Sequence, residues 1–121
     1  AQLNPENVDY VSAHATATLQ GDQAEAAAIG DVFGDQVPVS SLKGYIGHTL
    51  GASGAIELAA SLEMIAQSII YPTLNLDNID PQCNQITHVR EPLKKDIRVV
   101  LKNCFAFGGI NAALIVRKLN N

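Results

Sequence analysis

The alternation of apolar and polar positions predicts four extended segments. Residues 8–13 ("VDYVSA") are apolar and rich in β-forming side chains, and residues 36–43 ("QVPVSSLK") form a second short extended piece. Residues 97–107 and 110–119 are apolar at successive positions and are joined by two glycines, which is typical of two strands connected by a turn. Because successive residues of a strand point to opposite faces, we expect both faces of this sheet to be covered.

A first helix is predicted over residues 23–33, where apolar residues recur on one helical face. The spacing Asp22-x-x-Glu25 resembles a capping box with aspartate in place of serine or threonine. We therefore expect Asp22 to cap the helix, and Gly34 to end it.

A second helix is predicted over residues 51–68, and it is apolar nearly all round. A helix that is apolar on every side is a buried helix, and a chain of 121 residues has little with which to bury one completely. We therefore expect another domain or subunit to cover part of it. Glu57 lies inside this helix, and a lone buried carboxylate is costly, so it should have a partner or a bound cation.

The resulting order of elements is β-α-β-α-β-β, which indicates one domain of the α/β class with a mixed sheet packed against a buried helix. The formal net charge of −4 argues against a nucleic-acid-binding protein, because phosphate binding needs clustered lysine and arginine. No apolar stretch is long enough to cross a bilayer, and no targeting segment is visible. With no secretion signal, Cys83 and Cys104 are expected to be reduced thiols in a cytoplasmic protein.

Two histidines stand out because each lies among small residues at the junction of an extended or loop segment with a helix: His14 in "SAHATAT" and His48 in "GYIGHTLGASGA". In α/β proteins such junctions hold ligands beyond the strand ends. Two imidazoles aimed at one carbonyl can donate hydrogen bonds to a developing oxyanion or exchange a proton with the reacting group. Lys43 would hold one imidazole neutral by repulsion, or pair with Glu25.

Less specific interpretations stay open for these residues. A single loop histidine is more often an ordinary surface residue, and His88, which is flanked by charged residues, is expected at the surface. A metal site built on His14 and His48 is weakly supported, because no acidic or thiol ligand stands at metal-binding spacing.

Three motifs resemble the C-terminal half of the β-ketoacyl-[acyl carrier protein] synthases, condensing enzymes with a thiolase-like fold. "AHATAT" is similar to their His-Gly-Thr-x-Thr stretch, and "SSLKGYIGHTLGASGA" to their Ser-x-Lys-x-x-x-Gly-His-x-x-Gly-Ala-x-Gly stretch. "NCFAFGGINAALI" is similar to their Asn-Ser-Phe-Gly-Phe-Gly-Gly-Thr-Asn stretch. The motifs occur in the family's order, and the resemblance implies that residues 1–121 form a C-terminal ketosynthase domain of thiolase-like fold.

The resemblance implies a role at each matched position. His14 and His48 would polarise the thioester carbonyl of a malonyl-carrier protein during decarboxylation and stabilise the enolate that follows. Lys43 would support them, near Glu25. Thr16 and Thr18 would bind the phosphopantetheine arm. Phe107 would act as a gate, with the backbone of Gly108 beside the substrate. Asp22 and Glu25 would be supporting residues. Glu57 and Asn103 match residues around a monovalent cation in some members.

The resemblance also implies what the chain lacks. The nucleophilic cysteine of the family belongs to the N-terminal half, and neither Cys83 nor Cys104 fits that role, so we expect this fragment alone to be inactive. Ala15 and Ala106 replace two of the family's glycines. Because alanine adopts a positive φ only at a cost, we expect Ala106 to stiffen the gate around Phe107.

The whole protein, by resemblance, is an acyltransferase that joins an acyl group held on cysteine to malonyl-carrier protein in fatty acid or polyketide biosynthesis. The resemblance implies no resident cofactor, because the phosphopantetheine arm arrives on the acyl carrier protein, and it implies no catalytic metal. It implies the N-terminal half and a second copy of the protein as further partners, and no nucleic acid or membrane. The alternative is a non-catalytic partner of a ketosynthase, similar to a chain-length factor; a cysteine in the missing half would decide for the enzyme.

One position suggests a further expectation. Lys102 replaces a small residue beside Asn103, at the family's cation position. We expect its ammonium to neutralise buried Glu57 and so to make a bound monovalent cation unnecessary.

Overall fold

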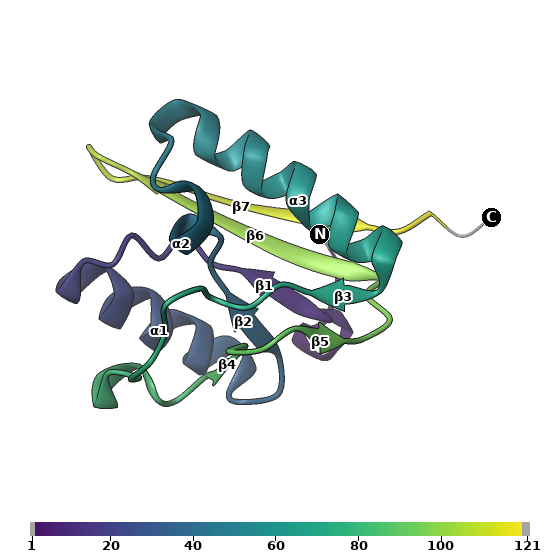
Figure 1. The fold of residues 1–121 in the computed structure, drawn as a ribbon, viewed down its shortest axis with the longest axis horizontal. Coiled ribbons are helices and arrows are strands. Elements are labelled where there is room, and N and C mark those ends of the chain that lie inside the picture. Colours follow the sequence, from purple (N-terminus) through teal and green to yellow (C-terminus); the bar gives the residue numbers. More distant parts are fainter. Residues whose placement is uncertain (1, 120–121) are drawn as a thin grey trace.

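A five-stranded mixed sheet forms the centre of the computed structural model, which describes residues 2–119 (Figure 1). The strand order is β4-β2-β1-β6-β7. Four neighbouring strands run parallel, and β7 pairs antiparallel with β6 from Val99↔Arg117 to Ala106↔Ile110. A separate antiparallel pair joins β3 and β5. The strand bounds are β1 Tyr10–Ser12, β2 Pro38–Ser40, β3 Ile69–Ile70, β4 Thr87–His88, β5 Leu93–Lys94, β6 Val99–Ala106 and β7 Ile110–Arg117.

Two helices of 15 residues cover opposite faces of the sheet, α1 (Leu19–Phe33) and α3 (Ser53–Gln67) (Figure 1). Each face has its own hydrophobic cluster. Tyr10 and Val100 pack with Met64 of α3, whereas Val11 packs with Ile29 of α1. The alternation of side chains along β1 therefore divides the core into two layers. The shorter helices are α2 (Lys43–Ile46) and the 3₁₀ turns Pro5–Asn7, Leu50–Ala52 and Pro81–Cys83.

The first helix begins earlier than its sequence pattern predicts. It starts at Leu19, so Asp22 lies in its first turn, and the predicted capping box does not form. Thr18 occupies the N-cap position without a side-chain hydrogen bond to the helix. The predicted end at Gly34 is confirmed: its φ is 57°, and its backbone N–H donates to the carbonyl of Gly30.

Within the described residues the second helix is buried on one face only, and the cover expected for its other side from another domain or subunit stays a prediction. Its buried face carries Glu57 and Met64, while Ile56 and Leu62 on the other side are 42% and 50% exposed. The edge strand β7 is also largely exposed, unlike the first half of β6, although Val116 packs against the hydrophobic cluster on the α3 side. None of the helices in the described part of the chain is long and apolar enough to span a membrane.

Two alanines near His14 adopt backbone angles that favour glycine. Ala15 has a φ of 29° and Ala17 a φ of 61°, and both belong to the loop between β1 and α1. Ala106, in contrast, is the last residue of β6 and has no positive φ. The reason for expecting Ala106 to stiffen the gate around Phe107 therefore does not apply, because Gly108 and Gly109 supply the positive φ angles there, at 85° and 78°.

Replacing exposed Ala17 by glycine should stabilise the domain. A left-handed backbone conformation costs a residue with a Cβ roughly 1–2 kcal/mol, and glycine removes this cost. Glycine also raises the conformational entropy of the unfolded chain, which offsets part of the effect, so the free energy of unfolding should rise by about 0.5–1 kcal/mol. The matched control is Ala27→Gly on the exposed face of α1, which should lower the free energy of unfolding by about 1 kcal/mol. The denaturant midpoints of the Ala17→Gly and Ala27→Gly variants measure the two changes in the free energy of unfolding. Equal shifts of the two midpoints in the same direction would contradict the prediction.

Candidate active site

The carboxyl ends of β1, β2 and β6 meet at one edge of the sheet, because these strands run parallel. His14 follows β1 by two residues, Lys43 begins α2 shortly after β2, and His48 lies just before the turn that leads into α3. The α2 helix, the start of α3 and the β6–β7 turn lie at this same end of the molecule (Figure 1). Ligands of α/β proteins bind outside the carboxyl ends of strands, and the chain places its chemically active side chains there.

The rings of His14 and His48 approach one another, although 33 residues separate them in the sequence. Their centroids are 5.2 Å apart and their planes make an angle of 86°. His14 is buried, with 8% of its surface exposed, whereas His48 is exposed. The predicted convergence of the two imidazoles is confirmed.

Hydrogen bonds fix which nitrogen of each imidazole carries the proton in the neutral state. The backbone N–H of Leu50 lies 3.2 Å from Nδ1 of His48, and Nζ of Lys43 lies 3.5 Å from Nδ1 of His14. A backbone N–H and an ammonium can only donate, so both Nδ1 atoms accept. The proton of each neutral ring is then on Nε2, and the site offers two N–H donors.

Burial lowers the pKa of His14 below its usual value of 6.5, and the positive charge of Lys43 lowers it further. Glu25 opposes the shift, while Lys102 and His48 add smaller repulsive contributions. His14 is therefore neutral near pH 7, which keeps its Nδ1 free to accept and its Nε2 ready to donate.

In an NMR pH titration, His14 of the folded protein should titrate below pH 6.5. In the pH range between the pKa of His14 in the folded protein and 6.5, the unfolded chain binds a proton at this residue and the folded chain does not. The contribution of His14 to the free energy of unfolding therefore falls as the pH drops through 6.5. A ring signal that titrates at or above 6.5 would contradict the assignment.

Glu57 links two lysines beneath the histidines. Its Oε1 lies 2.5 Å from Nζ of Lys43, and its Oε2 lies 2.6 Å from Nζ of Lys102, in side chains that are 0%, 7% and 3% exposed respectively. The second contact is at ion-pair distance, although its angles fall outside those of a hydrogen bond. Burial lowers the pKa of Lys102, and Glu57 opposes that shift.

Two expectations from the sequence meet different outcomes here. The pairing of Lys102 with Glu57 is confirmed. The pairing of Lys43 with Glu25 is wrong, because Lys43 binds Glu57 of α3, whereas Glu25 lies on α1 at the opposite face of the sheet.

Glu25 instead holds the loop that carries His14. It accepts hydrogen bonds from the backbone N–H groups of His14 (2.9 Å) and Ala15 (2.7 Å), and from Nδ2 of Asn103 in β6 (3.1 Å). Glu25 is 5% exposed, so these bonds are shielded from water. The carboxylate thereby fixes the position of His14 relative to β6.

Thr16 and Thr18 lie side by side in the loop before α1, with their Oγ1 atoms 3.1 Å apart. A Cβ on Gly21 would lie 2.5 Å from Oγ1 of Thr18, so glycine allows the first turn of α1 to approach this pair. Burial raises the pKa of Asp22, and the backbone N–H groups of Ala17 and its neighbours oppose that rise.

Phe107 stands at the tip of the β6–β7 turn and is 100% exposed, with Gly108 beside it. The aromatic ring that contacts His14 is that of Phe105, at a centroid distance of 5.6 Å and an interplanar angle of 74°. The sequence interpretation missed Phe105. Its signal is the alternation along β6, which places Phe105 on the same face as Asn103 and so towards the loop of His14.

Ser53 was also missed. It is fully buried at the first turn of α3, and its Oγ lies 3.1 Å from Nδ1 of His48. Together with the Leu50 N–H it fixes the orientation of the His48 ring. A serine in a glycine- and alanine-rich helix start carried no distinct signal in the sequence.

A family model described as "Beta-ketoacyl synthase, C-terminal domain" matches residues 1–77. The chain belongs to the β-ketoacyl synthases. Over 115 residues it is 41% identical to 3-oxoacyl-[acyl-carrier-protein] synthase 1 of Escherichia coli K12, covering 94% of this chain and 28% of that protein. It is 42% identical over 122 residues to nodulation protein E of Rhizobium leguminosarum bv. trifolii, covering 98% and 30%.

The thiolase-like fold expected for a β-ketoacyl synthase is shown by solved structures. A β-ketoacyl synthase from Burkholderia phymatum STM815 superposes with a TM-score of 0.96 at 45% identity, covering 99% of this chain and 30% of that one. The ishigamide ketosynthase/chain length factor superposes with a TM-score of 0.92 at 34% identity, covering 98% and 30%. The chain spans less than a third of the length of each of these relatives.

The residues of this β-ketoacyl synthase chain do not fit the monovalent cation that the resemblance implies for some members. Nζ of Lys102 occupies the space beside Glu57, within 3.5 Å of the carbonyl oxygens of Ser12, Ala13 and Asn103. The side chain of Asn103 points to Glu25 on the other face of the sheet. An added ion would have to share this space with an ammonium of the same charge.

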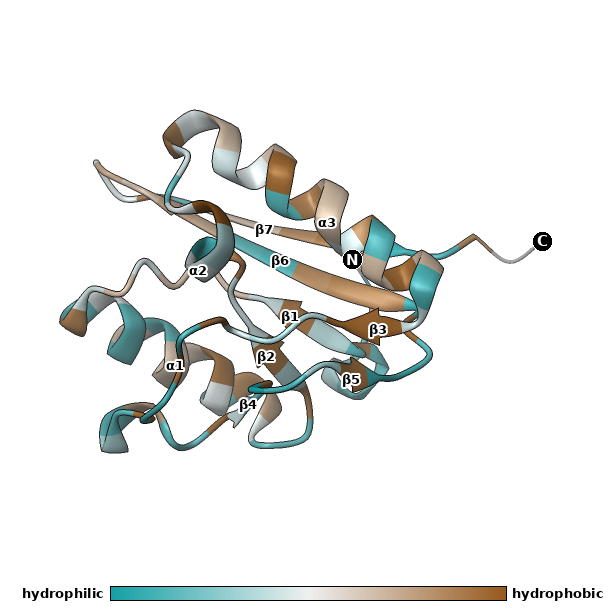
Figure 2. Ribbon diagram, in the orientation of Figure 1, coloured by the Kyte–Doolittle hydropathy of each residue, from teal (hydrophilic) through white to brown (hydrophobic). Residues whose placement is uncertain are grey.

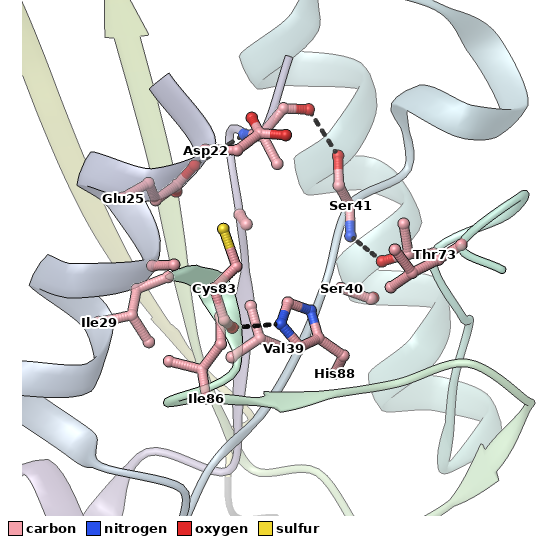
Figure 3. A pocket seen from close by; sticks show the side chains of 14 residues that line it. Asp22, Glu25, Ile29, Val39, Ser40, Ser41, Thr73, Cys83, Ile86 and His88 are labelled. Atoms are coloured by element: carbon pink, nitrogen blue, oxygen red, sulfur yellow. Dashed lines mark hydrogen bonds between the residues drawn. The ribbon is translucent and has the colours of Figure 1, made fainter. Parts of the chain in front are cut away.

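A cavity of about 120 Å³ lies on the α1 side of the sheet, and neither His14 nor His48 lines it (Figure 3). Cys83 and His88 line it together with Asp22.

His88 is half-buried rather than at the surface as expected, because its Nε2 lies 2.7 Å from the carbonyl oxygen of Cys83. Burial raises the pKa of the Cys83 thiol, which makes it a poor nucleophile. Within the described residues Cys83 and Cys104 are both free, and the reduced state expected for them stays a prediction.

Proposed function

We propose that the chain is the C-terminal part of an acyltransferase, a β-ketoacyl-[acyl carrier protein] synthase. The observation that carries the proposal is the pair of converging imidazoles, in which Nδ1 of each ring faces a donor and Nε2 has no hydrogen bond to the described residues. Two N–H donors beside each other suit a single carbonyl oxygen that becomes negative during reaction. The names of the relatives support the same reaction class.

In the proposed reaction, His14 and His48 donate from Nε2 to the thioester oxygen of malonyl-carrier protein. The bond to the carboxylate breaks, carbon dioxide leaves, and the electron pair forms an enolate whose oxygen both imidazoles stabilise. The enolate carbon then attacks the acyl thioester carbonyl, and the cysteine thiolate leaves. Burial and the charge of Lys43 keep His14 neutral, and Lys43 also orients its ring.

The other predicted residues keep their proposed roles around this centre. Thr16 and Thr18 would hydrogen-bond the phosphopantetheine arm, and Phe107 with Gly108 would close over the acyl chain. The paired hydroxyls and the fully exposed ring support these roles. Asp22 and Glu25 would hold the loop of His14, and the reaction would need no cofactor, because the arm is part of the substrate.

The proposed partners are the acyl carrier protein, an N-terminal half that supplies the cysteine, and a second copy of the protein, in the cytoplasm. One related structure is a type II polyketide ketosynthase, AntDE, in complex with its acyl carrier protein AntF, with a TM-score of 0.92 at 33% identity. The exposed apolar face of α3, which includes Ile56 and Leu62, supports a covering half.

A non-catalytic, chain-length-factor-like partner is the second candidate, and the similarity of the chain to the ishigamide ketosynthase/chain length factor favours it. Such a partner has no use for a neutral His14 ring or for a second imidazole oriented towards it. The contacts of Lys43 with His14 and Glu57 therefore favour the enzyme.

The full protein that contains this chain provides the test. It is incubated with an acyl donor and malonyl-carrier protein, and mass spectrometry follows the acyl label and the condensed product. We expect the label on a cysteine outside residues 1–121 and a β-ketoacyl product. A protein that neither binds the acyl group covalently nor decarboxylates malonyl-carrier protein would be the non-catalytic partner.

A further inference from the structure

Four oxygen atoms surround the ammonium of Lys102. Nζ lies 2.6 Å from Oε2 of Glu57 and 2.6 Å from the carbonyl oxygen of Asn103. The carbonyl oxygens of Ala13 and Ser12 are 3.4 and 3.5 Å away. These four atoms, here called the oxygen cage, come from β1, the residue that follows it, β6 and α3.

The oxygen cage has the chemistry of a cation site rather than that of a simple ion pair. Carboxylate and carbonyl oxygens are the ligands that hard cations prefer, and three of the four atoms here are main-chain carbonyls. Lys102 is 3% exposed and Glu57 is fully buried, so water does not complete the shell. A positive charge at this point compensates Oε2 of Glu57, which accepts no hydrogen bond from the described residues, whereas Lys43 contacts the other oxygen, Oε1.

The backbone of β6 determines where this charge stands. Lys102 pairs with Ser12 of β1 on one side and with Leu114 of β7 on the other. Its side chain therefore starts from the middle of the sheet and reaches the oxygen cage from below α3. An ion held only by the oxygens could exchange with solvent, whereas this ammonium is covalently attached.

We propose that Lys102 is a built-in monovalent cation: its ammonium replaces an exchangeable ion in the oxygen cage, and removing the amine converts the cage into a site for potassium or ammonium. The protein as it stands is then insensitive to the identity of monovalent cations at this position. The inference concerns the stability of the fold and does not depend on the proposed function.

The test compares thermal unfolding of the full-length protein with that of its Lys102→Ala variant. Ionic strength is held constant with choline chloride, and potassium or ammonium chloride replaces it stepwise. Without small cations the variant should unfold roughly 5–10 °C below the parent, because Glu57 loses one of its two partners. The melting temperature of the variant should rise as potassium or ammonium is added, since a ligand that binds only the folded state stabilises it.

Lys102→Met is the matched control, because methionine fills the space of the lysine stem and leaves no room for an ion. It should be destabilised and should not respond to potassium or ammonium beyond the parent. The parent should melt at the same temperature in choline chloride and potassium chloride.

Two results would overturn the proposal. One is a parent protein whose melting temperature falls when potassium is replaced by choline, and this measurement needs no variant to fold. The other is a Lys102→Ala protein that responds to cations no more than Lys102→Met. Either result leaves the condensation assay unaffected, so failure here is distinct from failure of the proposed function.

Discussion

Glu57→Gln should lower the free energy of unfolding by about 3–5 kcal/mol, the range found when one partner of a buried ion pair is removed. Glutamine keeps the shape of the side chain but leaves Lys43 and Lys102 as two buried ammoniums without a counter-charge. The loss should also release Lys43 from beside His14. The denaturant midpoint of the full-length protein measures the change.

Glu63→Gln is the matched control on the same helix. Glu63 is exposed, so its replacement should change the free energy of unfolding by less than about 0.5 kcal/mol. Adding Lys102→Met to Glu57→Gln removes one of the unpaired charges and should recover part of the loss. Equal midpoints for Glu57→Gln and Glu63→Gln would show that Glu57 does not balance the two lysines.

His48→Ala should reduce the decarboxylation of malonyl-carrier protein by about 10²–10³-fold, which is the usual effect of removing one oxyanion donor. It should leave acyl loading of the cysteine unchanged, because that step does not need this donor. Radiolabelled carbon dioxide release measures the first rate and mass spectrometry of the acyl-enzyme measures the second. Nε2 of His48 is one of the two imidazole donors that converge at this site.

His88→Ala serves as the control, since His88 lines the separate cavity and contacts the carbonyl of Cys83. It should change the decarboxylation rate by no more than a few-fold. Decarboxylation at the full rate in His48→Ala would remove His48 from the proposed mechanism.

The main elements of the fold could be predicted from the sequence because their hydrophobic patterns are strong. The parallel pairing of β1 with β6 could not be predicted from pattern alone, since it joins residues about 90 positions apart. The start of α1 was misplaced, because Asp22 resembles a cap while the helix gains a further turn from Leu19. β4 was missed because it is two residues long. The hydrophobic residues of β6 are interrupted by a hydrophilic stretch (Figure 2), which consists of Lys102 and Asn103 in the sequence of the strand.

Candidate site residues were recognisable where residue type and spacing carried chemistry, as for His14 and His48. The partner of Lys43 was not, because the choice between Glu25 and Glu57 depends on which face of the sheet each helix covers. Phe105 was overlooked in favour of Phe107 for a similar reason: only strand register tells which ring turns towards His14. The Lys102–Glu57 pair could be anticipated, because a buried carboxylate in an apolar helix needs a positive neighbour.

The 90-residue separation between β1 and β6 also has a consequence for synthesis on the ribosome. His14 and its carboxylate support Glu25 emerge well before Asn103 and Lys102. Until they arrive, Oε2 of Glu57 lacks its ion-pair partner and β1 lacks one neighbouring strand. A nascent chain that stalls before residue 102 therefore carries both imidazoles without the geometry that would make them work together, and it exposes an unpaired strand edge that chaperones must protect.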